Sequence, residues 1–132
     1  METTTETYYV GNKPKKKNKS PEHDIQVKVC SVLEDLGVLY SATVGGVRLA
    51  MHTALKMKES GYKKGVPDII VFEPRGEYIG LAIEVKTEKG RPSQEQLEWQ
   101  KELNDRGWDA HICRGLDECL EAVYDYFNLW TV

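Results

Sequence analysis

The sequence contains few cysteines and no long hydrophobic run, and both shortages exclude classes of protein. Its three cysteines are widely spaced and form no Cys-x-x-Cys pair. This argues against a disulfide framework and a cysteine zinc site, and it favours a reducing compartment. No apolar run approaches the ~20 residues needed to cross a bilayer, and the N-terminal residues lack the apolar stretch of a signal peptide. We therefore expect a cytoplasmic protein without a membrane partner.

The sequence also lacks the excess of positive charge that many nucleic-acid-binding domains carry. Its 18 Lys and Arg residues stand against 21 Asp and Glu residues, a formal net charge of −3. This total conceals a gradient, because residues 1–64 carry 11 basic and 7 acidic side chains whereas residues 95–132 carry 3 and 9. One end of the molecule can therefore meet a polyanion that the other end would repel.

Length and hydrophobic patterning predict a single domain that follows a polar N-terminal segment. Residues 1–19 show no apolar period and end in a run of lysines, so we expect a flexible basic tail there. Residues 20–132 fit the size of one domain. Hydrophobic residues make up 40% of the chain, which is enough to build a core.

The spacing of apolar residues and the positions of Gly and Pro predict the order of helices and strands. The predicted helices cover residues 21–36, 47–60, 94–106 and 116–128. The predicted strands cover residues 38–44, 69–72, 78–85 and 108–113. Pro74 and Gly76 separate the two middle strands and predict a hairpin turn. This order favours an α/β domain in which helices flank a small mixed sheet.

Two carboxylates and one ammonium group converge at one edge of the predicted hairpin. Asp68 opens its first strand, and Glu84 and Lys86 lie near the end of its second. Gly76 is the midpoint between Asp68 and Glu84, so an antiparallel hairpin folded there places both carboxylates at the same edge of the sheet. Because side chains alternate along a strand, Glu84 and Lys86 share one face and Val85 points into the core.

This pair of carboxylates predicts a site for a divalent cation. Carboxylates that lie next to apolar strands are costly to bury unless their charge is compensated. Oxygen ligands without Cys or His suit Mg²⁺, for which Mn²⁺ can substitute. A metal held in this way supports phosphodiester hydrolysis by activating water. Lys86 would then orient that water or stabilise the charge that develops on the phosphate.

The residues around this edge resemble a known family. Pro67-Asp68 followed by Glu84-Val85-Lys86 matches the PD-(D/E)xK nuclease signature. The surrounding motifs are similar to those of its VRR-NUC (virus-type replication-repair nuclease) branch: Gly46-Val47-Arg48, a helix with Lys56, Gly61, Gly65-Val66-Pro67-Asp68 and Ser93-x-x-Gln96-x-x-Trp99, with Leu103 and Gly107. The likeness covers roughly residues 20–115 and implies a restriction-endonuclease-like core.

The resemblance also implies roles for the residues that match the motif. Asp68, Glu84 and the backbone carbonyl of Val85 would hold the metal. Lys86 would be the catalytic lysine, and Gln96 would reach the active site from the following helix.

Two further residues have competing interpretations. The family's acidic ligand on the first helix would be Glu22, with Asp24 as the alternative, but acidic residues also suit the first turn of any helix. Gln96 follows Ser93 by three residues, so it also fits a capping box that satisfies its own helix start.

Cations that precede the motif predict where DNA would bind. We expect the following residues to contact backbone phosphates: Arg48, Lys56, Lys63 and Lys64. Trp99 and Trp108 are expected to be core aromatics rather than platforms for base stacking.

Taken together, the residues and the resemblance predict a Mg²⁺-dependent deoxyribonuclease. The resemblance implies a structure-specific endonuclease for branched DNA, similar to Holliday-junction resolvases, that works as a homodimer in a bacterial or phage-infected cytosol. A flap or single-strand-end nuclease with the same site is one alternative. A non-catalytic DNA-binding subunit built on a nuclease fold is the other.

Overall fold

A computed structural model describes residues 7–10, 13–16, 20–44 and 50–130 of the chain. The helices are α1 (Pro21–Leu36), α2 (Met51–Glu59), α3 (Gln94–Asp105) and α4 (Gly115–Phe127). The strands are β1 (Thr7–Val10), β2 (Lys13–Lys16), β3 (Tyr40–Ala42), β4 (Ile69–Val71), β5 (Leu81–Lys86) and β6 (Asp109–Arg114). Arg48, one of the predicted DNA contacts, lies outside the described residues.

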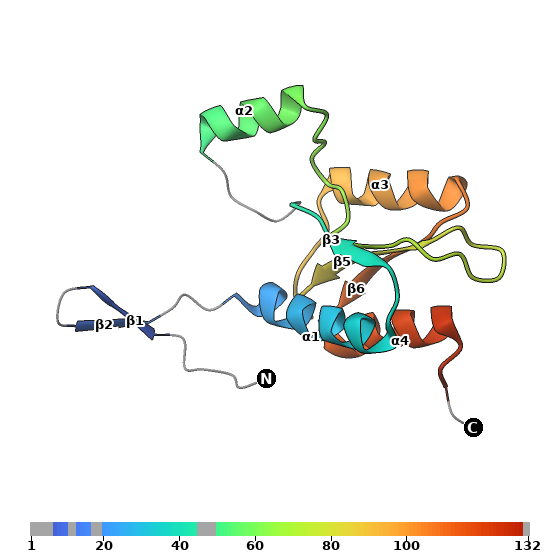
Figure 1. The fold of residues 1–132 in the computed structure, drawn as a ribbon. Coiled ribbons are helices and arrows are strands. Elements are labelled where there is room, and N and C mark those ends of the chain that lie inside the picture. The colour runs from blue at the N-terminus through green and yellow to red at the C-terminus, as the bar shows by residue number, and fades with distance from the viewer. Residues whose placement is uncertain (1–6, 11–12, 17–19, 45–49, 131–132) are drawn as a thin grey trace.

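The central sheet has four strands in the order β3-β4-β5-β6. The β3·β4 and β4·β5 pairs are antiparallel, whereas β6 is parallel to β5 because α3 carries the chain back between them. In Figure 1, α1 and α4 lie on one face of the sheet and α3 lies on the other. The predicted mixed sheet with flanking helices is therefore confirmed.

The core lies between this sheet and the helix pair α1 and α4. Leu33 of α1 and Val123 of α4 are fully buried against the sheet. On β5, Leu81, Ile83 and Val85 belong to this core, and the residues between them point to the opposite face. All of β5 from Leu81 to Val85 is buried, so the strand that carries Glu84 is held from both sides.

Predicted and observed boundaries differ most in the hairpin. The second strand begins at Leu81 rather than at residue 78, because Tyr78 lies in a tight turn in which its backbone pairs with that of Arg75. The register is nevertheless the predicted one: Ile69 pairs with Ile83 and Val71 pairs with Leu81, so residue 76 is the midpoint.

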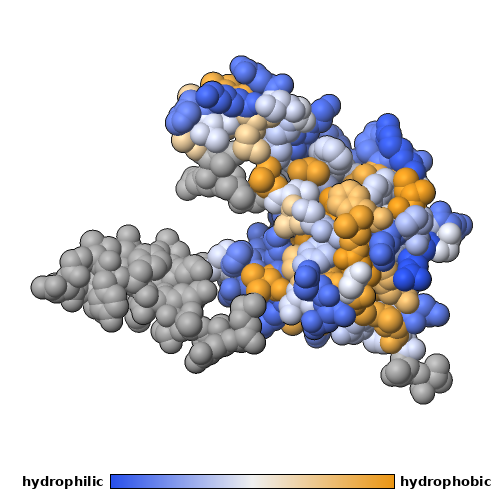
Figure 2. Space-filling model, viewed as in Figure 1, coloured by the Kyte–Doolittle hydropathy of each residue, from blue (hydrophilic) through white to orange (hydrophobic). Residues whose placement is uncertain are grey.

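The segment between β3 and β4 extends away from the sheet. Ala42 and Ile69 are paired neighbours, so the chain leaves the sheet and returns to it at the same edge. None of the residues of α2, which lies in this segment, is buried. Figure 1 shows α2 apart from the other helices, and in Figure 2 its visible surface is largely hydrophilic.

Two short strands occur within the predicted N-terminal tail. Thr7–Val10 and Lys13–Lys16 pair as an antiparallel hairpin that is separate from the central sheet. The sequence analysis predicts no strand here, so this hairpin corrects it. The overlooked signal is the β-forming Thr-Tyr-Tyr-Val segment followed by Gly11-Asn12, a frequent turn pair.

Among the described residues, no helix has the length and apolar character required to cross a membrane.

Two leucines on α1 test where the core lies. Leu33 has no exposed surface, whereas Leu36 is 37% exposed. We expect Leu33→Ala to lower the free energy of unfolding by about 2–4 kcal/mol because it leaves a cavity against the sheet. Leu36→Ala, the matched control, should cost less than about 1 kcal/mol. Urea denaturation of both variants measures the difference, and equal losses would contradict this assignment of the core.

Candidate active site

The hairpin register places Asp68 and Glu84 side by side at the edge of the sheet. Each lies one residue beyond the pair Ile69 and Ile83, at the start of β4 and near the end of β5. Asp68 is held in place because its Oδ2 accepts a hydrogen bond of 2.8 Å from the backbone N–H of Val85. The convergence predicted from the midpoint of the hairpin is therefore confirmed.

Lys86 lies on the same face as Glu84, as the alternation of side chains requires. Its Nζ is 3.7 Å from Oε2 of Glu84, and only 13% of the lysine side chain and 6% of the glutamate side chain are exposed. Val85, between them, points the other way and is buried in the core. The site thus holds two carboxylates and one ammonium group in a largely desolvated place.

Gln96 combines the two roles that the sequence analysis treats as alternatives. Its backbone N–H donates to Oγ of Ser93, and its Oε1 accepts from the backbone N–H of Ser93 at 2.9 Å, which completes a capping box. Its Nε2 donates to Oε2 of Glu84 at 3.1 Å. Because the cap fixes one end of the amide, the other end is aimed at the carboxylate.

The surroundings of Glu84 disfavour the charged form of its carboxyl group. Burial raises its pKa to about 9, and the neighbouring Asp68 carboxyl adds to this effect. The Lys86 ammonium lowers the pKa but does not compensate. Oε2 has Gln96 as a partner, whereas the buried Oε1 has no hydrogen-bond partner among the described residues.

This oxygen set fits a hard divalent cation. An unpartnered buried oxygen beside a second carboxylate is costly without a positive charge, and Mg²⁺ takes one or two carboxylates plus water or phosphate oxygens. Across the described residues, no three His, Cys, Asp or Glu side chains gather closely enough to hold a metal by themselves. Glu22 on α1 makes the smallest of the contributions that raise the pKa of Glu84, and Asp24 is exposed. The assignment of Glu22, rather than Asp24, as the acidic residue of the first helix stays a prediction.

Two hydrogen bonds from Thr43, which the sequence analysis missed, also hold the segment around Asp68. The backbone N–H of Thr43 donates to the Asp68 carbonyl at 2.8 Å, and its Oγ1 donates to the Pro67 carbonyl at 2.6 Å. Thr43 follows β3 directly, so these bonds extend the strand pairing up to the carboxylate. Nothing in the local sequence marks this threonine, because the contact joins positions far apart in the chain.

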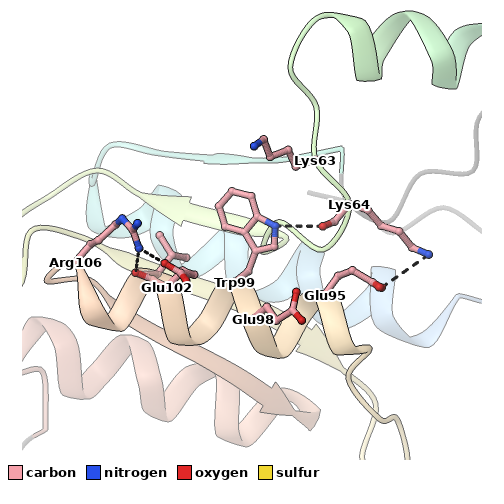
Figure 3. A pocket seen from close by; sticks show the side chains of 8 residues that line it. Lys63, Lys64, Glu95, Glu98, Trp99, Glu102 and Arg106 are labelled. Atoms are coloured by element: carbon pink, nitrogen blue, oxygen red, sulfur yellow. Dashed lines mark hydrogen bonds and ion pairs between the residues drawn. The ribbon is translucent and has the colours of Figure 1, made fainter.

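The structure describes three of the four predicted DNA contacts, Lys56, Lys63 and Lys64. Lys63 and Lys64 line a groove of about 460 Å³ along α3, together with Trp99 and Arg106 (Figure 3). The other wall carries three glutamates, and Lys64 Nζ lies 3.9 Å from Oε1 of Glu95. Lys56 is exposed on α2. Lys63 and Lys64 thus have mixed rather than purely basic surroundings.

Trp99 departs from the prediction that it is a core residue. It is half-buried and stands in the groove of Figure 3, where its indole N–H donates to the Lys64 carbonyl at 3.1 Å. Its position on the outer side of α3 explains the difference, since that face is covered by the segment around Lys64 and not by the sheet. Trp108, also half-buried, packs over Gly80, where an added Cβ would lie 2.3 Å from its ring.

The raised pKa of Glu84 makes stability depend on pH. The pKa is about 9 in the folded protein against an ordinary value of 4.5, so between these values the unfolded chain releases a proton that the folded protein keeps. Without metal, the free energy of unfolding should therefore fall as the pH rises through this range. We expect Glu84→Gln, which cannot ionise, to be more stable than the parent at pH 7 by on the order of 2 kcal/mol.

Denaturation curves between about pH 5 and pH 9 in the presence of a chelator measure this difference. Glu88→Gln is the matched control, because Glu88 is exposed. A Glu84→Gln variant whose stability runs parallel to that of the parent across the range would contradict the buried, protonated carboxyl.

Comparison with known proteins agrees with this geometry. Residues 31–117 match the VRR-NUC domain family. A solved structure described as a VRR_NUC domain protein is 25% identical with a TM-score of 0.71, over 85% of this chain and 92% of that one. A second, described as a VRR_NUC domain, is 23% identical with a TM-score of 0.58, over 82% and 99%. No curated protein matches. The chain belongs to the VRR-NUC family and carries a nuclease-type domain.

Proposed function

We propose that this protein is a Mg²⁺-dependent endonuclease that cuts branched DNA, in the manner of a Holliday-junction resolvase. The observation that carries the proposal is the buried carboxylate pair of Asp68 and Glu84, with one unpartnered oxygen and with Lys86 beside it. Such a set is poorly suited to stabilising a fold, because burying it costs free energy. It is well suited to holding a cation against a phosphate.

Each residue of the set has a distinct task in this mechanism. When bound, Mg²⁺ would neutralise the carboxylates, lower the pKa of a water molecule and polarise the phosphate. Gln96 occupies Oε2 of Glu84 and thereby leaves Oε1 for the metal. The Val85 N–H orients Asp68, and the Val85 carbonyl is proposed as a further ligand. Lys86 would hold the attacking water or the charge on the phosphate. Glu22 is proposed as an outer acidic ligand.

A homodimer would match a symmetric branched substrate. Two active sites related by a two-fold axis can cut two strands of a four-way junction, and recognition would rest on shape and phosphate contacts. Exposed apolar side chains at the end of the chain offer a surface for a second copy: Leu129 is 40% exposed and Trp130 is 54% exposed. Flap cleavage with the same site is the competing activity.

The first test of this proposal is cleavage. We expect the wild-type protein with Mg²⁺ to cut a four-way junction, and to cut it faster than a flap, a splayed duplex or a linear duplex. Lys86→Ala should lower kcat by at least about 10²-fold while DNA binding is retained, because it removes transition-state stabilisation and not the bulk of the phosphate contacts. Lys101→Ala removes the same charge from an exposed lysine paired with Asp105 and should leave the rate unchanged.

The possible outcomes separate the candidate functions. Preferred cleavage of flaps would replace the junction substrate with the competing one. Tight binding without cleavage of any substrate, with Mg²⁺ or Mn²⁺, would indicate a DNA-binding subunit and overturn the nuclease proposal. Full activity in Lys86→Ala would show that the site is wrong.

The second test needs no substrate. Saturating Mg²⁺ should raise the Tm of the wild-type protein by about 3–6 °C, because the ion binds the folded site only. Asp68→Asn combined with Glu84→Gln should abolish this shift. The control pair Asp35→Asn and Glu121→Gln, both at exposed positions, should retain it. A shift that persists without the two site carboxylates would place the metal elsewhere.

A further inference from the structure

A second cavity opens at the carboxyl ends of β5 and β6. Its volume is about 650 Å³, and the loop that follows β5 forms much of its wall. Three cations line it: Lys89 and Arg91 from this loop and Arg114 from the last position of β6. The sequence analysis assigns no role to any of these three residues.

This cavity adjoins the proposed active site. Arg114 is the register partner of Lys86 on the neighbouring parallel strand. The loop that carries Lys89 and Arg91 begins directly after Lys86 and ends at Ser93, whose backbone N–H donates to the same Gln96 side chain that contacts Glu84. Strand register and this loop therefore place the cavity beside Lys86, at the carboxyl end of β5.

The charge of this cavity is less compensated than that of the groove along α3. Only one carboxylate, Glu88, lines it against three cations, whereas three glutamates face the three cations of the groove. None of the three cavity cations has an ion-pair partner in the part of the chain that the structure describes. In the groove, Lys64 pairs with Glu95 and Arg106 pairs with Glu102.

The positive charge comes from side chains and not from a helix end. Although α4 begins next to Arg114, Oε2 of Glu118 accepts the backbone N–H of Arg114 at 2.5 Å and offsets the dipole there. Glu88 lies against the start of α4, where a Cβ on Gly115 would be 3.1 Å from its Cγ. The guanidinium and ammonium groups therefore remain available for an external anion.

We propose that this cavity is the phosphate-binding subsite that holds the DNA strand next to the scissile bond. Lys89, Arg91 and Arg114 bind backbone phosphates there. The groove with Lys63 and Lys64, where three glutamates offset the charge, then makes weaker contacts. This inference rests on the proposed function, because it takes the position of the cavity relative to the carboxylates as the path of the substrate.

Binding to a fluorescently labelled four-way junction tests the subsite without relying on cleavage. In a Lys86→Ala background with Mg²⁺, Lys89→Ala combined with Arg114→Ala should raise Kd about tenfold or more. It should also reduce the slope of log Kd against log salt by roughly 0.9 for each phosphate that the protein no longer neutralises. In the same Lys86→Ala background, Arg114→Lys alone keeps Lys89 and the positive charge at position 114. This variant should retain most of the affinity for the junction.

A control pair removes the same charge from other faces of the protein. Lys28→Ala combined with Lys101→Ala changes exposed lysines on α1 and α3 and should leave Kd within about twofold. Melting curves for every variant show that it is folded. Unchanged affinity in the cavity pair, or an equal loss in the control pair, would overturn the subsite.

The failure of the subsite can be told apart from the failure of the proposed function. If the wild-type protein binds junctions but cuts nothing, while the cavity pair binds weakly, the subsite stands and the nuclease proposal falls. If the wild-type protein cuts and the cavity pair binds and cuts equally well, the subsite falls alone. A wild-type protein that binds no DNA overturns both.

Discussion

One hydrogen bond, from the Val85 backbone N–H to the Asp68 carboxylate, links the sheet to the chemistry. It ties the start of β4 to the end of β5, so the carboxylate can reach its position only in the observed register. A slip of one residue would turn Val85 toward the site and Glu84 into the core, because side chains alternate along a strand. The buried face of β5 forbids that slip. The hydrophobic core thus selects the register, and the register assembles the site.

The hydrophobic core offsets the free-energy cost of burying the carboxylates of the site. Glu84 loses its hydration, faces another carboxylate and has one oxygen without a partner among the described residues. These effects oppose folding, and Lys86 and Gln96 offset only part of them. The fully buried residues on the opposite face of the same strand, such as Ile83 and Val85, make up the difference. A single strand therefore carries a strongly stabilising face and a strongly destabilising one.

The sequence predicted those parts of the structure that depend on local pattern. Alternation along the strand and the midpoint at Gly76 placed Asp68, Glu84 and Lys86 together, and the Ser93 to Gln96 spacing predicted the helix cap. It could not predict contacts between distant positions, such as the Thr43 bonds to the segment around Asp68 or the contact of Trp99 with Lys64.

The same limit explains why the sequence did not predict the cavity lined by Lys89, Arg91 and Arg114. Lys63 and Lys64 are adjacent in sequence and form an obvious run of charge, and the fold places three glutamates of α3 in the same groove. Arg114 is separated from Lys89 by the whole of α3, and only the parallel pairing of β6 with β5 brings them to one cavity. A charge pattern read along the chain finds runs of charge, whereas a binding surface is assembled across it.

The segment between β3 and β4 has a consequence for how such a domain can diversify. It leaves the sheet at Ala42 and re-enters at Ile69, two residues that are already paired, and its helix buries nothing in the core. Insertions or deletions around α2, away from Thr43 and from the Lys64 segment that packs on α3, would leave the strand register and the carboxylates undisturbed. Because it emerges at the edge where Asp68 lies, a change in its length or sequence would still alter the surroundings of the two carboxylates. For the proposed nuclease, substrate preference could thus evolve separately from the cleavage chemistry.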